Sequence, residues 1–125
     1  MRDSAEGAFL ADCHARLAVE IIANKWAVVV LFALSRGPRR HGELVALVGG
    51  VSRKVLTQTL RRLQGYGLVE RRAHAEAPPR VEYRLTDLGL TLVEPIAVLT
   101  EWAKTYGAAV ADFHEATEDE ADSDG

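Results

Sequence analysis

Residues 49–72, GGVSRKVLTQTLRRLQGYGLVERR, limit the fold of this chain more than any other segment does. Two glycines lead into Ser52, whose side chain caps helix N-termini well, and Gly67 is a typical helix stop. Between these signals, leucines recur at the three- and four-residue spacing of one helix face. They are Leu56, Leu60 and Leu63. The segment therefore predicts an amphipathic helix from Ser52 to about Tyr66 that packs on a core through its leucines.

The opposite face of this predicted helix is cationic and carries no acid. On a helical wheel, the side chains farthest from the leucines are Lys54, Thr57, Gln58, Arg61 and Arg62. An ordinary surface helix mixes both signs of charge. A helix that enters the DNA major groove instead needs cations for phosphates and hydrogen-bonding side chains for base edges. The face indicates nucleic-acid binding, although for this helix alone a solvated polar face is an equal alternative.

The charge of the chain divides in the same way. The net charge is −3, yet residues 36–84 contain eleven Lys and Arg against four Glu. The rest of the chain contains four Lys and Arg against fourteen acids, and seven of those acids lie in residues 112–125. The basic middle is typical of a phosphate-binding surface. The acidic, apolar-poor end predicts a disordered tail.

The elements around the cationic helix have the order of a winged helix-turn-helix. Helices are predicted over 11–24, 26–37 and 41–50, the last with Leu44, Leu47 and Val48 inward, and Trp26 is expected in the core. Strands 68–72 and 81–86 follow, joined by a loop with two prolines and flanked by Arg71, Arg72, Arg80 and Arg84. Apolar residues from Leu88 to Tyr106 predict a long helix that Pro95 kinks or restarts. The fold class is α+β, mainly α.

Length and residue usage exclude several other classes. With 125 residues we expect one domain, residues 11–111, between a flexible N-terminus (1–10) and the acidic tail (112–125). No apolar run approaches the ~20 residues of a membrane span, and no secretory signal is recognisable. The one cysteine suits a reducing cytoplasm. The four histidines form no zinc or thiol-enzyme pattern, so we expect no enzyme, metal or cofactor.

Three stretches carry a family resemblance. They are IIANKWAVVVLFAL (21–34), GPRRHGELVALVGGVSRKVLTQTLRRLQGYGLVERR (37–72) and PPRVEYRLTDLG (78–89). In these the chain resembles the HxlR-type family of bacterial winged-helix transcription regulators, relatives of the MarR-like group. The resemblance implies a cytoplasmic, nucleoid-associated homodimer, joined through its first and last helices. Such a dimer binds an inverted repeat in double-stranded DNA, usually as a repressor.

The resemblance also assigns positions. Residues 52–62, opened by Ser52, would form the recognition helix. Bases would be contacted by Arg53, Lys54, Thr57 and Gln58, and phosphates by Arg61 and Arg62. Further backbone contacts would come from Arg39, Arg40 and His41 before the preceding helix, and from Arg72, His74 and Arg80 in the wing. For any one arginine, the alternative is a side chain that faces solvent or is paired within the molecule.

Cys13 is the remaining candidate. Family members often carry a cysteine near the first helix, and several sense oxidants or electrophiles with it; there proline usually follows, whereas here His14 does. The alternative for Cys13 is a small hydrophobe at a dimer interface. A small-molecule effector is a further expectation. The alternative for the whole chain is a winged-helix protein–protein interaction module without sequence-specific DNA binding.

Overall fold

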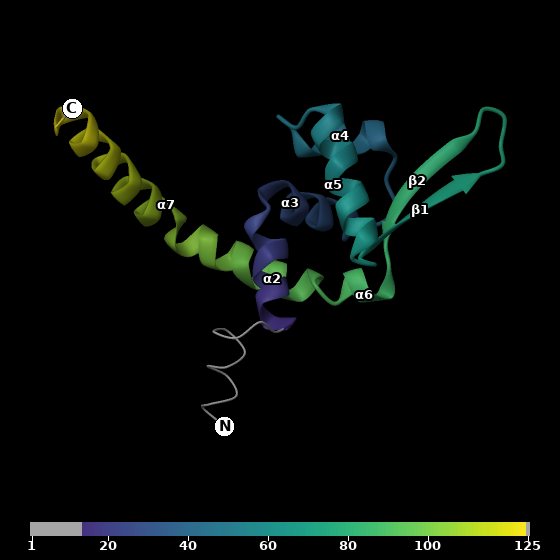
Figure 1. Cartoon of the computed structure of the whole chain (residues 1–125), viewed down its shortest axis with the longest axis horizontal. Coiled ribbons are helices and arrows are strands. Elements are labelled where there is room, and N and C mark those ends of the chain that lie inside the picture. The colour runs from purple at the N-terminus through teal and green to yellow at the C-terminus, as the bar shows by residue number, and fades with distance from the viewer. Residues whose placement is uncertain (1–13, 125) are drawn as a thin grey trace, which may run out of the picture. The chain divides into compact units, whose positions relative to one another are not determined.

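The computed structural model describes residues 14–124 of the chain, and the side chains of these except 15, 22 and 121–124 (Figure 1). The elements are α2 (His14–Ala23), α3 (Lys25–Leu34), α4 (His41–Val48), α5 (Arg53–Gly65), β1 (Val69–His74), β2 (Arg80–Leu85), α6 (Asp87–Leu90) and α7 (Val93–Asp124). They form two compact units that divide after Val93.

Asn24 lies between α2 and α3 and caps the start of α3. It was predicted to stop the first helix, and α2 does end at Ala23. Its Oδ1 also accepts hydrogen bonds from the backbone N–H groups of Trp26 and Ala27, both at 3.1 Å, so it starts α3 as well. Trp26, predicted to be in the core, is only half-buried, and the Lys25 ammonium lies 4.6 Å from its ring centroid.

The core of the first unit lies between α3, α4 and α5. The predicted leucine face of α5 is confirmed, since Leu56, Leu60 and Leu63 are fully buried together with Val30, Leu31 and Leu44. The inward prediction for α4 is right for Leu44 but wrong for Leu47, which is 55% exposed, and Val48 is half-buried. The eight-residue α4 has apolar side chains on more of its surface than the core covers.

The two strands form an antiparallel hairpin that extends from the helices (Figure 1). Their register pairs Val69 with Leu85 at the base and His74 with Arg80 at the tip. The loop is shorter than predicted and contains a cis peptide bond before Pro78. Arg39 adds to the free edge of β2: its N–H donates to Tyr83 O at 2.9 Å and its C=O accepts from Tyr83 N at 2.8 Å. The segment before α4 is thereby tied to the wing.

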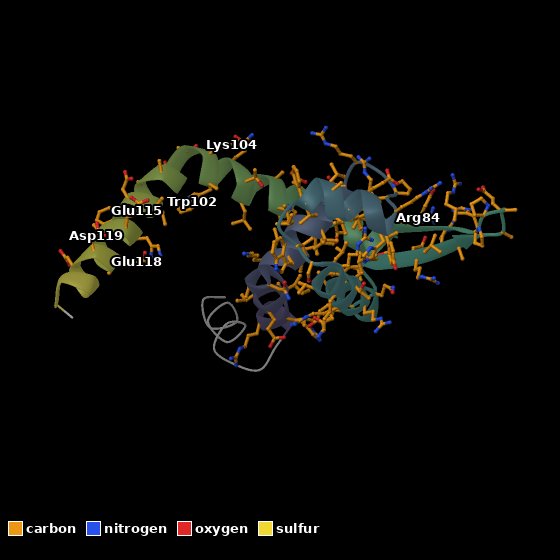
Figure 2. The ribbon with its side chains drawn as sticks, turned by 90° about the horizontal axis from the view of Figure 1, so that it is seen from above. Arg84, Trp102, Lys104, Glu115, Glu118 and Asp119 are labelled. Carbon is orange, nitrogen blue, oxygen red and sulfur yellow. The ribbon has the colours of Figure 1, made fainter. Side chains whose placement is uncertain are left out.

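The long C-terminal helix restarts near Pro95, one of the two predicted alternatives, and differs from the prediction at its C-terminal end. The chain forms the short α6 first and restarts at Val93, so that Pro95 lies in the first turn of α7, where a missing N–H is tolerated. Residues 112–124, predicted to be disordered, continue α7 to Asp124 as helix, and the side chains of residues 112–120 are exposed (Figure 2). Alanine and glutamate favour helix, elongation avoids a new nucleus, and His114 pairs with Glu118 at 2.9 Å.

Candidate nucleic-acid interface

The start of α5 is fixed by a cap. Ser52 Oγ accepts a hydrogen bond from Val55 N at 3.1 Å, as its predicted N-cap role requires. Because this hydroxyl is used in the cap, Ser52 holds the helix terminus in place. At the other end, Tyr66 is the C-cap and Gly67 takes a φ of 75°, a left-handed conformation that suits glycine.

Five of the predicted DNA-binding residues lie together on the exposed side of α5. They are Arg53, Lys54, Gln58, Arg61 and Arg62. Within residues 14–124 none of their side chains forms an ion pair; Arg62 lies over the Tyr66 ring, 5.9 Å from its centroid. The face therefore presents four cations and one amide, all available to an external ligand.

Thr57 and His41 bond to each other. The Thr57 hydroxyl donates to Arg53 O at 2.9 Å, so its oxygen accepts from the Nε2–H of His41 at 3.0 Å. Thr57 is half-buried as a result. Both residues were predicted to contact DNA, yet in this arrangement their polar atoms join α4 to α5.

The residues before α4 have separate environments. Arg40 is the N-cap residue, and its backbone N–H donates to Glu43 Oε1 at 3.0 Å, while its side chain is exposed. Arg39 has its backbone bonded to β2, and its Nε is buried without a hydrogen-bond partner among the described residues. Arg40 is thus free to reach a phosphate, whereas Arg39 is held inward.

The cations predicted for the wing are paired with carboxylates on one face of the hairpin. Arg72 contacts Glu70 at 3.2 Å and His74 contacts Glu82 at 3.6 Å. Arg80 contacts Glu82 at 3.2 Å and Glu76 at 3.5 Å. The cations on this face of the hairpin are thus paired within the molecule, which was the predicted alternative to DNA contact.

Glu70 is the centre of this network at the base of the wing. It also pairs with Arg84, which lies where the hairpin leaves the helices (Figure 2). The hydrogen bond from the Arg84 guanidinium is the main cause that holds the pKa of Glu70 below its usual range. The carboxylate therefore stays ionised at neutral pH and offsets two arginines.

Two features of this surface were missed from the sequence. Arg71 is exposed on the other face of the hairpin and has no partner in residues 14–124. The two-residue period of a strand could have predicted that Arg71 and Arg72 lie on opposite faces.

A groove of about 190 Å³ also joins the start of α3 to α5. Its lining includes Asn24, Trp26, Gln58 and Arg62. No local pattern could place these two helices side by side.

Two further predictions, the redox role of Cys13 and the lack of a membrane-spanning helix, do not concern this surface. Cys13 lies outside the described residues. None of the helices within residues 14–124 combines the length and the hydrophobicity of a membrane-spanning segment.

Comparison with known proteins bears on this geometry. The model of the HxlR-like helix-turn-helix family matches residues 21–111. The HTH-type transcriptional regulator YkvN of Bacillus subtilis is 38% identical over 95 residues, which cover 76% of this chain and 80% of YkvN. The structure of the transcriptional regulator YtfH from Salmonella typhimurium is 34% identical with a TM-score of 0.71, and covers 86% of this chain and 96% of YtfH.

The redox regulator HypR, in its oxidised form, is similar in fold as well. It is 29% identical with a TM-score of 0.70, and the match covers 74% of this chain and 96% of HypR. These neighbours agree with the winged helix-turn-helix fold predicted from the order of helices and strands.

Proposed function

The chain belongs to the HxlR-like helix-turn-helix family of DNA-binding transcriptional regulators, and we propose that it represses transcription as a homodimer bound to an inverted-repeat operator. The observation that carries the proposal is the exposed face of α5. Arg53, Lys54, Gln58, Arg61 and Arg62 lie there without intramolecular ion pairs in the described part of the chain. In this role α5 enters the major groove, with Arg53, Lys54 and Gln58 toward bases and Arg61 and Arg62 toward phosphates.

The apolar side chains of α7 support a dimer. Leu99, Trp102, Tyr106, Val110 and Phe113 follow one another at intervals of three and four residues, and each is between 44% and 78% exposed. A repeated apolar stripe that remains exposed on a long helix is typical of an interface with a second copy. A two-fold dimer would present two α5 helices to one side of the duplex, about one DNA turn apart.

Selection of bound duplexes from a random pool tests this function. We expect an inverted repeat whose half-sites are separated by one helical turn, ~34–36 Å, or a multiple. Affinity for the selected site should fall steeply with salt, because phosphate contacts release condensed counterions. A pool that shows no enrichment, together with salt-insensitive binding, would favour the protein–protein interaction module instead.

The wing provides a second prediction. Glu70→Gln should raise affinity for any duplex about tenfold or more, because it releases Arg72 and Arg84 from their shared carboxylate. Each released cation that meets a phosphate should steepen the log–log salt dependence by about 0.9. Fluorescence anisotropy of a labelled duplex across a salt series measures both quantities. Because the pKa of Glu70 is lowered, the wild-type protein should show this gain only in acid, as pH falls through that lowered pKa.

Glu101→Gln is the matched control for this experiment. Glu101 pairs with Lys104 at 3.1 Å on α7, so the substitution removes the same charge without releasing a wing cation. Equal affinity and slope in Glu70→Gln and wild type would contradict phosphate contact by this face of the wing.

Redox sensing by Cys13 is a second candidate response, favoured because HypR is a redox regulator of the same fold. The chain has one cysteine, so oxidation would yield a Cys13–Cys13 bridge between subunits, a mixed disulfide or a sulfenic acid. We expect diamide to release wild-type protein from operator DNA and Cys13→Ser to remain bound, as measured by anisotropy. Release of both proteins would exclude the thiol switch.

A further inference from the structure

A cavity of about 320 Å³ opens between α3 and α4 on the first unit. Its main lining residues are Val29, Phe32, Leu47 and Val48, with Arg36 and Arg39. The volume is at the lower end of the range of small-molecule sites, about 300–1,000 Å³. The cavity is formed by described residues of one compact unit, so its shape does not depend on the position of α7.

The apolar part of this cavity is incompletely covered. Phe32 is 46% exposed, and Leu47 is 55% exposed although its pattern predicted burial. An apolar side chain gains free energy when it leaves water. A ligand with an apolar body would cover both residues.

The polar part consists of two guanidinium groups. Within residues 14–124 neither Arg36 nor Arg39 forms an ion pair or a side-chain hydrogen bond. The Nε of Arg39 is in addition buried without an acceptor, a state that native proteins rarely leave unexplained. Two cations without described acceptors in the cavity lining favour an anionic group on the ligand.

We propose that this cavity binds a small amphipathic organic anion, a carboxylate with a compact apolar body. The carboxylate accepts hydrogen bonds from Arg36 and Arg39, because guanidinium groups match carboxylates with parallel N–H donors. The apolar body covers Phe32 and Leu47. Binding is a property of the cavity alone, whereas an effector role of the ligand rests on the proposed function.

The cavity is connected to both parts of the candidate interface. Arg39 is bonded through its backbone to Tyr83 of β2, which anchors the wing. The same segment continues into α4, where His41 is bonded to Thr57 of α5. A ligand that orders Arg39 therefore acts on the segment that positions the wing and the recognition helix.

The test titrates the full chain, without DNA, with cyclohexanecarboxylate and with its neutral isostere cyclohexanecarboxamide. Isothermal titration calorimetry should show saturable binding of the carboxylate and at least tenfold weaker binding of the amide. Arg36→Gln should weaken carboxylate binding by at least tenfold. Arg16→Gln, which removes an exposed arginine on α2 outside the cavity, should leave it unchanged. Unaltered thermal unfolding of Arg36→Gln, whose side chain is exposed, checks that the variant folds.

Equal binding of acid and amide, or a Kd unaffected by Arg36→Gln, would overturn the proposal. Absence of saturable carboxylate binding to the wild-type protein would overturn it too. Because the titration contains no DNA, its result is independent of operator binding. Adding the selected operator then tests the effector role: the carboxylate should shift operator affinity in wild type and not in Arg36→Gln.

Discussion

Replacing both Arg61 and Arg62 with glutamine should weaken binding to operator and random duplex alike, by roughly a thousandfold at ~0.1 M salt. Both side chains are exposed on α5, and neither has an intramolecular ion pair in residues 14–124. In a dimer the change removes four phosphate contacts, so the log–log salt slope should fall by about 3.6. Anisotropy titrations on both duplexes from ~50 to ~300 mM salt measure affinity and slope together.

Two further variants serve as controls for this experiment. Arg16→Gln combined with Lys104→Gln removes two cations per subunit away from α5, and should leave the salt slope nearly unchanged. Gln58→Ala should instead relax the choice at one base pair, worth ~1–3 kcal/mol, and keep the slope, because an amide contacts a base edge and neutralises no phosphate. Wild-type affinity in the double arginine variant would mean that α5 is not the recognition helix.

The local parts of the fold could be predicted because each depends on neighbouring residues. Leucine spacing and the Ser52 cap located α5, and Gly67 located its end. Disorder of the tail was predicted from composition, which neglects that a helix already formed extends at little cost through Ala and Glu. Leu47 was misplaced because periodicity cannot tell how much of a short helix the core will cover.

The site was predictable in residue type but not in pairing. The cations of α5 remain available because no acid shares their face, which the sequence shows directly. The cations of the wing are paired with acids, either along one strand, as Arg72 with Glu70, or across the hairpin, as Arg84 with Glu70. A one-residue shift of register would separate Arg84 from Glu70, so the cross-strand pairs follow only from the way in which the strands pair.

Gly89→Ala should destabilise the first unit by about 3 kcal/mol and lower its Tm by roughly 10–20 °C. A Cβ at this buried position would lie 2.1 Å from Leu68 O and 3.3 Å from Leu85 Cδ2. The backbone cannot yield easily, because Leu68 O accepts from Thr86 N at 3.0 Å and Gly89 N donates to Thr86 Oγ1 at 3.0 Å. The change must therefore break or strain this junction between α6 and the start of β1.

Gly42→Ala is the matched control, since a Cβ there meets no atom of the described residues within 4 Å and the residue lies in α4. Alanine favours helix over glycine by about 0.5–1 kcal/mol, so this variant should melt at or above the wild-type temperature. Thermal unfolding followed by circular dichroism compares the two. A Gly89→Ala protein that melts with wild type would mean that α6 does not approach the start of β1 this closely.

The junction ties the base of the wing to α6, so its loss should also increase hydrogen exchange of the β1 and β2 amides before that of α5.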